Sequence, residues 1–154
     1  MPKIDIAAAP LIATTGYPGD YAKIVDGRIK QRLGDAGGLN QFGVNLTRLK
    51  PGAASAHRHW HAEEDEFVFI IAGEAMLVDD SGETKLRAGE AAAFPAGEAN
   101  GHHLVNRSGA DVLYLEIGTR TSRDTVEYTD PAIDLRAVND GSGWRYVKKN
   151  GEPW

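Results

Sequence analysis

The stretch HRHWHAEEDEFVFIIAG, residues 57–73, places three histidines at alternate positions and follows them with four acidic residues and an apolar run. Side chains two residues apart on a β-strand point to the same face of the sheet. His57, His59 and His61 are therefore predicted to face one way, and the residues between them the other way. Two imidazoles that converge from one strand are a suitable start for a metal site. A hydrated loop rich in histidine is the alternative that this stretch leaves open.

A carboxylate and a further histidine could complete such a site. Glu66 opens the apolar run and shares the parity of its predicted inner face. A turn over residues 62–65 would therefore bring its side chain back beside the histidines. Another ligand would have to come from elsewhere, and GHHLVN, residues 101–106, offers His102 or His103.

The composition narrows the function classes. A chain of 154 residues is expected to form one domain with a real core. The net charge of −5 does not favour binding to nucleic acid or to an anionic membrane, and no apolar run is long enough to span a bilayer. The chain has no cysteine, so any metal must be held by nitrogen and oxygen. The N-terminus lacks the pattern of a secretory signal, so a cytoplasmic location is expected.

Short segments with strand-like alternation dominate the middle of the chain, and turn residues separate them. No stretch of helical periodicity stands out between residues 40 and 120, while the tail, residues 121–154, is polar and rich in turn residues. An all-β sandwich or closed barrel is therefore predicted, and the pattern does not choose between them. The predicted strands lie in residues 40–49, 66–80, 84–97 and 102–120.

Two spaced motifs resemble those of the cupin superfamily. The first cupin motif has Gly, about five residues, His-x-His, three or four residues, Glu, six residues and Gly. This chain has Gly52, six residues, His59-Trp60-His61, four residues, Glu66, six residues and Gly73. The first spacer is thus about one residue longer than the family pattern.

The second cupin motif has Gly, five residues, Pro-x-Gly, two residues, His, three residues and Asn. This chain has Gly89, five residues, Pro95-Ala96-Gly97, four residues, His102, three residues and Asn106. The two extra residues before the histidine lie at Asn100-Gly101. More closely, the chain resembles a bacterial group of small single-domain cupins. Both motifs occur in order, which is far more specific than either one alone.

The resemblance implies a double-stranded β-helix, a jelly-roll barrel, with an N-terminal arm (1–40), a barrel core (41–120) and a C-terminal extension (121–154). It implies that His59, His61, Glu66 and His102 bind one divalent metal ion, namely Zn, Fe, Mn, Ni or Co. His102 rather than His103 is implied because it keeps the three-residue gap to Asn106. Cupins of this size commonly pair through an N-terminal strand, so a homodimer is also expected.

The remaining polar residues of these segments receive simpler interpretations. His57 could support the ligands from behind, contact a substrate or be solvated at the start of the strand, and the solvated interpretation is favoured because the histidine pair is already complete without it. The acidic residues 63–65 are expected to form a solvated turn. Trp60 is expected to pack away from the ligands. The polar side chains of residues 41–47 could line a cavity or an exposed sheet face, and both interpretations stay open.

The leading hypothesis is a metal-dependent enzyme, namely an isomerase, lyase or dioxygenase, that acts on a small oxygen-rich molecule. Glu66 could also serve as its base. A protein that binds or senses a small molecule through its metal, without turnover, is the alternative. A purely structural barrel, whose histidines pack without metal, is a third possibility.

Overall fold

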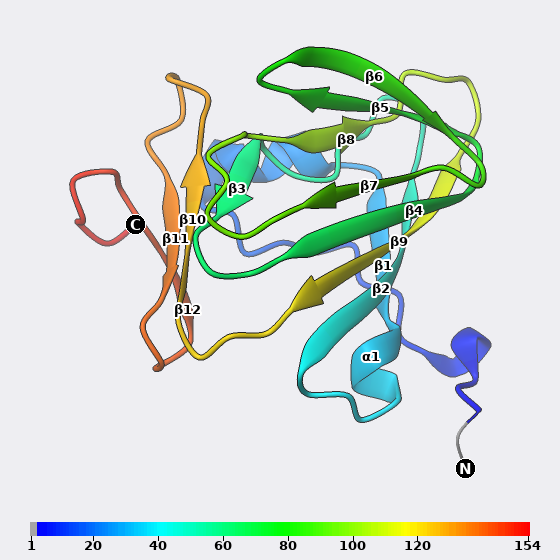
Figure 1. The fold of residues 1–154 in the computed structure, drawn as a ribbon, viewed down its shortest axis with the longest axis horizontal. Helices are drawn as coiled ribbons and strands as arrows, with labels where there is room; N and C mark the ends of the chain where they lie inside the picture. The colour runs from blue at the N-terminus through cyan, green and yellow to red at the C-terminus, as the bar shows by residue number, and fades with distance from the viewer. Residues whose placement is uncertain (1–2) are drawn as a thin grey trace.

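The computed structural model describes residues 3–154, which form three antiparallel sheets (Figure 1). The main sheet has the strand order β1-β2-β9-β4-β7, a second has the order β12-β11-β10-β3, and a third has the order β6-β5-β8. The strands are β1 (Arg28–Arg32), β2 (Phe42–Leu49), β3 (His59–His61), β4 (Glu66–Ala72), β5 (Glu74–Asp79), β6 (Gly82–Arg87), β7 (Ala91–Phe94), β8 (His103–Val105), β9 (Val112–Thr119), β10 (Asp124–Tyr128), β11 (Arg136–Asn139) and β12 (Trp144–Val147). The helices are η1 (Ile6–Ala8), η2 (Gly19–Val25) and α1 (Leu33–Ala36).

The predicted all-β jelly-roll fold is confirmed, and the strand predictions between residues 40 and 120 hold. The predicted strand over residues 66–80 is divided into β4 and β5 at Gly73. The φ of Gly73 is 82°, a conformation that favours glycine. A Cβ at this position would also lie 2.5 Å from the carbonyl oxygen of Asp111, so the turn needs glycine for space as well as conformation. No helix described within residues 3–154 is long and apolar enough to cross a membrane.

Two apolar clusters hold the sheets together. The first lies within the barrel and includes Leu49, Ile70 and Tyr114, all fully buried. The second lies between η2 and the C-terminal strands and includes Tyr17 and Leu135. The functional groups described below lie where strands from both regions meet.

The segments at the two ends of the chain are integral to the fold. Strand β1, from the predicted arm, pairs with β2 along its whole length. The boundary predicted at residue 41 therefore separates two strands that pair with each other. The tail forms β10, β11 and β12, and β10 pairs with β3. Sequence pattern missed β1 because RIKQR, residues 28–32, carries cationic side chains on one face and so lacks an apolar alternation.

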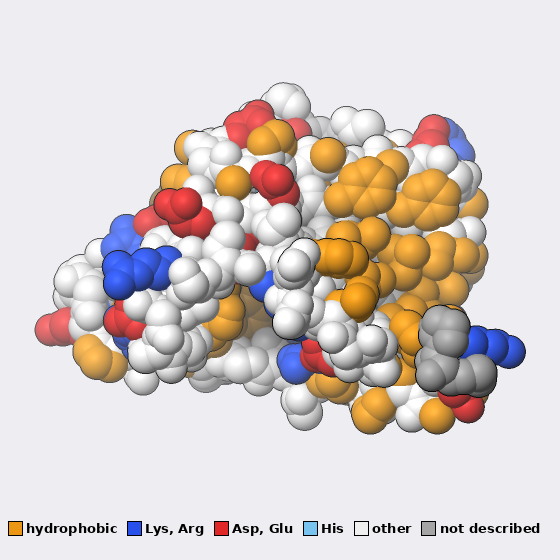
Figure 2. All heavy atoms as spheres, turned by 60° about the horizontal axis from the view of Figure 1, so that its bottom comes forward, with side chains coloured by type: hydrophobic (Ala, Val, Ile, Leu, Met, Phe, Trp, Pro, Cys, Tyr) orange, Lys and Arg blue, Asp and Glu red, His pale blue; other side chains and the backbone are white. Residues whose placement is uncertain are grey.

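The outer face of β4 is strongly apolar. Val68 and Ile70 point into the core, whereas Phe67, Phe69 and Ile71 are each more than one third exposed. Figure 2 shows hydrophobic side chains gathered over one broad face of the molecule. An exposed apolar face of this kind is typical of an interaction surface. The homodimer stays a prediction, and this face is one that a second chain would cover.

Candidate metal centre

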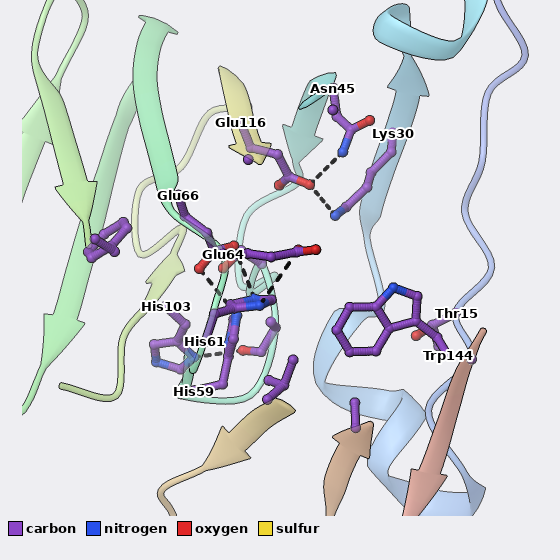
Figure 3. A pocket seen from close by; sticks show the side chains of 18 of the residues that line it. Thr15, Lys30, Asn45, His59, His61, Glu64, Glu66, His103, Glu116 and Trp144 are labelled. Atoms are coloured by element: carbon purple, nitrogen blue, oxygen red, sulfur yellow. Dashed lines mark hydrogen bonds and ion pairs between the residues drawn. The ribbon is translucent and has the colours of Figure 1, made fainter. Parts of the chain in front are cut away.

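Four side chains from both sequence motifs converge on one point inside the barrel. His59 and His61 project from β3, Glu66 from the start of β4, and His102 from the residue before β8. The Nε2 atoms of His59 and His61 lie 3.7 and 3.5 Å from the Glu66 carboxylate, and the Nε2 atom of His102 lies 2.9 Å from it. Figure 3 shows the labelled members of this group facing the cavity. The structure thus brings together all four predicted ligands.

Each histidine turns the same nitrogen toward the site because its other nitrogen has a partner. The Nδ1 atom of His59 lies 2.7 Å from the carbonyl oxygen of His57, and that of His102 lies 3.1 Å from the carbonyl oxygen of Asn100. A carbonyl oxygen only accepts, so each Nδ1 must be the protonated nitrogen that donates. The Nε2 lone pairs are therefore left for the site, as in histidines that bind metals.

Asp124 holds the third histidine. Its Oδ2 atom lies 2.5 Å from Nδ1 of His61, and its Oδ1 atom accepts a hydrogen bond from the Glu63 backbone at 2.8 Å. This carboxylate is only 2% exposed, and it comes from β10 in the C-terminal extension. A carboxylate behind a histidine fixes the ring and raises its basicity as a ligand. Sequence reasoning missed Asp124 because no spacing links it to either motif.

The two extra residues before His102 keep this histidine in the site. The carbonyl of Asn100 receives its Nδ1 proton, and Gly101 lies against Thr129, where a Cβ would come within 2.2 Å of Oγ1. Phe94 stacks on the His102 ring at a centroid distance of 3.5 Å and an interplanar angle of 1°. The insertion therefore carries both an orienting carbonyl and a glycine that the packing requires.

The protonation preferences of these groups follow from burial and from their neighbours. Burial lowers the pKa of His59 to about 4, so its imidazole is neutral at pH 7. Burial alone would lower the pKa of His61, but the hydrogen bond and charge of Asp124, with the charge of Glu66, raise it. Burial alone would raise the pKa of Glu66, but a hydrogen bond from Nε2 of His102, which donates only when that ring carries both of its protons, and the nearby histidines lower it to about 2. Glu66 is thus an anionic carboxylate.

This donor set fits a divalent first-row metal ion. The ligand atoms of His59, His61 and Glu66 all lie within 4.8 Å of one another, and His102 contacts the same carboxylate. Imidazole nitrogens and one carboxylate are the ligands that Zn, Fe, Mn, Ni and Co share. Among the described residues, 3–154, no hydrogen-bond donor reaches the Nε2 lone pairs of His59 and His61.

The prediction that His57 is solvated is wrong. Strand β3 begins only at His59, so His57 does not share its face. Its Nε2 atom lies 2.8 Å from the carbonyl oxygen of Tyr21, and its ring packs edge-on against Tyr17 at a centroid distance of 5.0 Å. Alternation could not reveal this, because the chain bends before the strand starts.

The acidic turn is only partly as predicted. Glu63 and Asp65 are exposed, but the Glu64 side chain is only 14% exposed. Its Oε1 atom accepts hydrogen bonds from the backbone and hydroxyl of Thr121 at 2.9 and 3.1 Å. Glu64, with His61 and Asp124, forms a second group of close titratable side chains. Glu64 therefore ties the turn to the C-terminal extension.

The site opens into a cavity of about 740 Å³. The main sheet and the C-terminal sheet line it, and Trp144, half exposed, lies beside the entrance (Figure 3). Of the residues left open over 41–47, Asn45 lines this cavity and donates to Glu116 at 2.9 Å, whereas Gln41 is exposed outside it. His103 also reaches the cavity, with its Nδ1 atom 2.7 Å from the carbonyl oxygen of Ala56.

Comparisons with known proteins agree with this fold and site. A family model described as a cupin domain matches residues 45–118. No curated protein matches the chain. A crystal structure of a sugar phosphate isomerase of the cupin superfamily from Silicibacter pomeroyi is 48% identical, covers 99% of this chain and 96% of its own, and superposes with a TM-score of 0.94.

Two further solved structures are more distant. A protein from Acidithiobacillus ferrooxidans, provisionally named a sugar phosphate isomerase, is 29% identical over 80% of this chain and 77% of its own, with a TM-score of 0.72. A polyketide cyclase from Streptomyces resistomycificus is 20% identical over 77% of this chain and 79% of its own, with a TM-score of 0.62. The cyclase shares the fold alone.

Proposed function

This chain belongs to the cupin superfamily, and on that premise we propose that it is a metal-dependent isomerase of a small phosphorylated sugar. The observation that carries the proposal is the convergence of three imidazole Nε2 atoms on the Glu66 carboxylate, inside a cavity open to solvent. Each imidazole is oriented by its own acceptor, which is the arrangement of a site built to hold a metal.

Isomerisation is proposed over the other reactions because of sequence similarity across nearly the whole chain. The Silicibacter pomeroyi protein named a sugar phosphate isomerase is 48% identical and covers both motifs and both ends of this chain. The cyclase relationship is too distant to carry a reaction. The cavity suits a sugar, since polar side chains from several strands line it.

His59, His61, Glu66 and His102 would hold the metal in this proposal. A bound divalent metal supplies Lewis-acid polarisation of a substrate oxygen. The chain's own residues then fix the substrate and move the proton that isomerisation requires between neighbouring carbons. Glu66 borders the cavity in its ionised form, but its low pKa makes it a weak base, so its role as the base stays a prediction. Trp144, exposed at the entrance, offers an apolar ring face to the sugar.

Two measurements test the proposal. Elemental analysis of protein purified without an affinity tag should give about one metal ion per chain. The metal-loaded protein should then interconvert an aldose phosphate and its ketose phosphate in a panel of phosphorylated sugars, followed by NMR. Metal binding without turnover of any phosphorylated sugar would favour the binding or sensing alternative. Protein that takes up no divalent metal would contradict both metal-dependent functions.

A further inference from the structure

Strand β1 places a row of cationic side chains along one wall of the cavity. Arg28, Lys30 and Arg32 occupy alternate positions, so they share one face of the strand, and all three line the cavity. Their α-carbons are spaced about 7 Å apart from one to the next, from the rise of a strand. The whole chain carries a net charge of −5, yet five Lys and Arg residues and three Glu residues line this cavity.

The members of this row differ in how their charges are used. Arg28 donates to the carbonyl oxygen of Ser55 at 2.5 Å. Lys30 pairs with Glu116, which also accepts a hydrogen bond from Asn45 (Figure 3). Arg32 is exposed at the rim, and its side chain makes no ion pair or hydrogen bond with any residue of the described chain, 3–154. Its charge is therefore open to a ligand.

A second arginine lies on the same side of the cavity. Arg120 follows β9, pairs with Asp35, and donates to the carbonyl oxygen of Leu39 at 3.1 Å. Its guanidinium lies along β2, where a Cβ built at Gly43 would meet two of its nitrogens at 3.6 Å. Arg120 is therefore fixed near the rim.

Between the histidines and the cationic side chains, two neighbouring strands of the main sheet carry glycine at paired positions. We call this part of the cavity surface the glycine floor. Gly118 pairs with Glu66 across β9 and β4, and Gly43 pairs with Gly118 across β2 and β9. Both glycines line the cavity. Arg32 lies at the next level, opposite Asn45, three strand spacings from β4. The distance from β1 to β4 across the sheet is therefore about 14 Å. A small elongated molecule could span it, because the side chains of Arg32 and Glu66 reach in from its two ends.

We propose that Arg32, flanked by Lys30 and Arg120, binds the phosphate group of the substrate, while the opposite end of the substrate lies over the glycine floor beside Glu66. This inference rests on the proposed function for the identity of the substrate. The substrate class is a phosphomonoester of a small sugar with its phosphate remote from the reacting carbons. The planar fork of an arginine suits bidentate recognition of phosphate.

The test uses inorganic phosphate as the probe and the full chain with its metal. Binding of phosphate, measured by isothermal titration calorimetry, should weaken about tenfold or more in Arg32→Ala, since a charge-assisted contact is removed. Arg123→Ala is the matched control, because Arg123 is exposed and does not line the cavity. It should bind phosphate as the wild type does. Circular dichroism checks that both variants fold.

His61→Ala separates this subsite from the metal centre. Phosphate binding that survives in His61→Ala and is lost in Arg32→Ala supports the rim as the phosphate site. Equal binding by Arg32→Ala and the wild type overturns the inference, and so does binding that only His61→Ala abolishes. With a phosphorylated sugar that turns over, Arg32→Ala should raise KM and leave kcat nearly unchanged. A failed isomerase assay with intact, Arg32-dependent phosphate binding would contradict the proposed reaction and leave the anion site standing.

Discussion

The two walls of the cavity differ in the groups that they present: one presents imidazole lone pairs and a carboxylate, and the other presents cationic side chains. On the histidine wall, formed by His59, His61, Glu66 and His102, each imidazole has one nitrogen held by an oxygen acceptor and the other turned inward. On the cationic wall, formed by Arg28, Lys30 and Arg32 of β1, positive charges face the cavity, and the Arg32 side chain has no partner among residues 3–154. A metal ion needs lone pairs, and an anion needs positive charge. One cavity therefore offers two chemically distinct ends.

The largest expected effect breaks the histidine wall. His61→Ala should reduce metal content to a small fraction of one ion per chain and lower thermal stability, because metal binding stabilises the native state. Elemental analysis and calorimetry measure both. His57→Ala is the matched control, since His57 packs against Tyr17 and holds no site atom. It should keep the metal while losing about 1–2 kcal/mol of unfolding free energy. Full metal content in His61→Ala would remove this residue from the ligand set.

Asp124→Asn weakens the same wall from behind. The variant keeps the size of the side chain but removes the charge that His61 faces at 2.5 Å. Metal affinity should fall about 10- to 100-fold, as for other carboxylates that orient a metal-binding histidine. Competition with a chelating dye measures the affinity. Asp111→Asn, at an exposed ion pair with Arg48, should leave the affinity unchanged. An unchanged affinity in Asp124→Asn would make this carboxylate purely structural.

On the cationic wall, Lys30→Met tests the partly buried pair with Glu116. Burial by itself raises the pKa of Glu116, but the charge and hydrogen bond of Lys30, with the amide of Asn45, lower it below its usual value of 4.5. Removing Lys30 leaves this carboxylate without its cation, and the unfolding free energy should fall by about 1–3 kcal/mol. Lys85→Met, at a more exposed pair with Glu74, should cost at most about 0.5 kcal/mol.

The pH dependence of the Lys30→Met effect follows from the same pair. Because the folded-state pKa of Glu116 is lowered, its ionised form contributes stability above pH 4.5, and this contribution is lost as pH falls below that value. The loss of unfolding free energy caused by Lys30→Met should therefore be largest near pH 7 and become smaller as the pH falls below 4.5. Urea titrations across this range measure it. A difference that grows on acidification would contradict the pairing.

The smallest expected change lies on the floor between the walls. Gly43→Val places a branched side chain in the cavity, where the nearest atoms are those of Arg120 at 3.6 Å. The residue lies within a strand and has no positive φ, so the fold should tolerate valine. Inorganic phosphate should bind about as in the wild type, while KM for a phosphorylated sugar should rise several-fold. Unchanged KM would show that the substrate does not cross this floor.

Sequence reasoning recovered the all-β class because the strands alternate cleanly around buried residues such as Val68 and Ile70, and the resemblance to the cupin motifs supplied the barrel. It failed at both ends of the chain for physical reasons. Strand β1 turns charged side chains inward, so its alternation is of charge and not of hydrophobicity. The C-terminal strands are short and interrupted by turns such as DGSG, residues 140–143, and nothing in their own pattern marks the strand partner β3.

The same limits apply to the site. The resemblance of the two motifs to those of cupins implied His59, His61, Glu66 and His102, and the structure brings these four together. Sequence reasoning excluded His57 from the ligands but missed its packing against Tyr17, because parity holds only within a regular strand and the chain bends before His59. Sequence reasoning also missed the role of Glu64, because the sequence of an acidic cluster does not show whether its side chains are hydrated or bound by a distant residue such as Thr121.

The sequence by itself determined the all-β class and the exclusion of thiolate ligands, and its resemblance to the two cupin motifs implied the barrel and the four residues that converge, because these depend on residue type and on short spacings along the chain. Only the tertiary structure decided that Asp124 stands behind His61, that β1 supplies a cationic wall, and that Gly43 and Gly118 face each other between the two walls. His61 and Asp124 are 63 positions apart along the chain, and Gly43 and Gly118 lie on different strands, so pairing between strands, not order along the chain, brings these residues together.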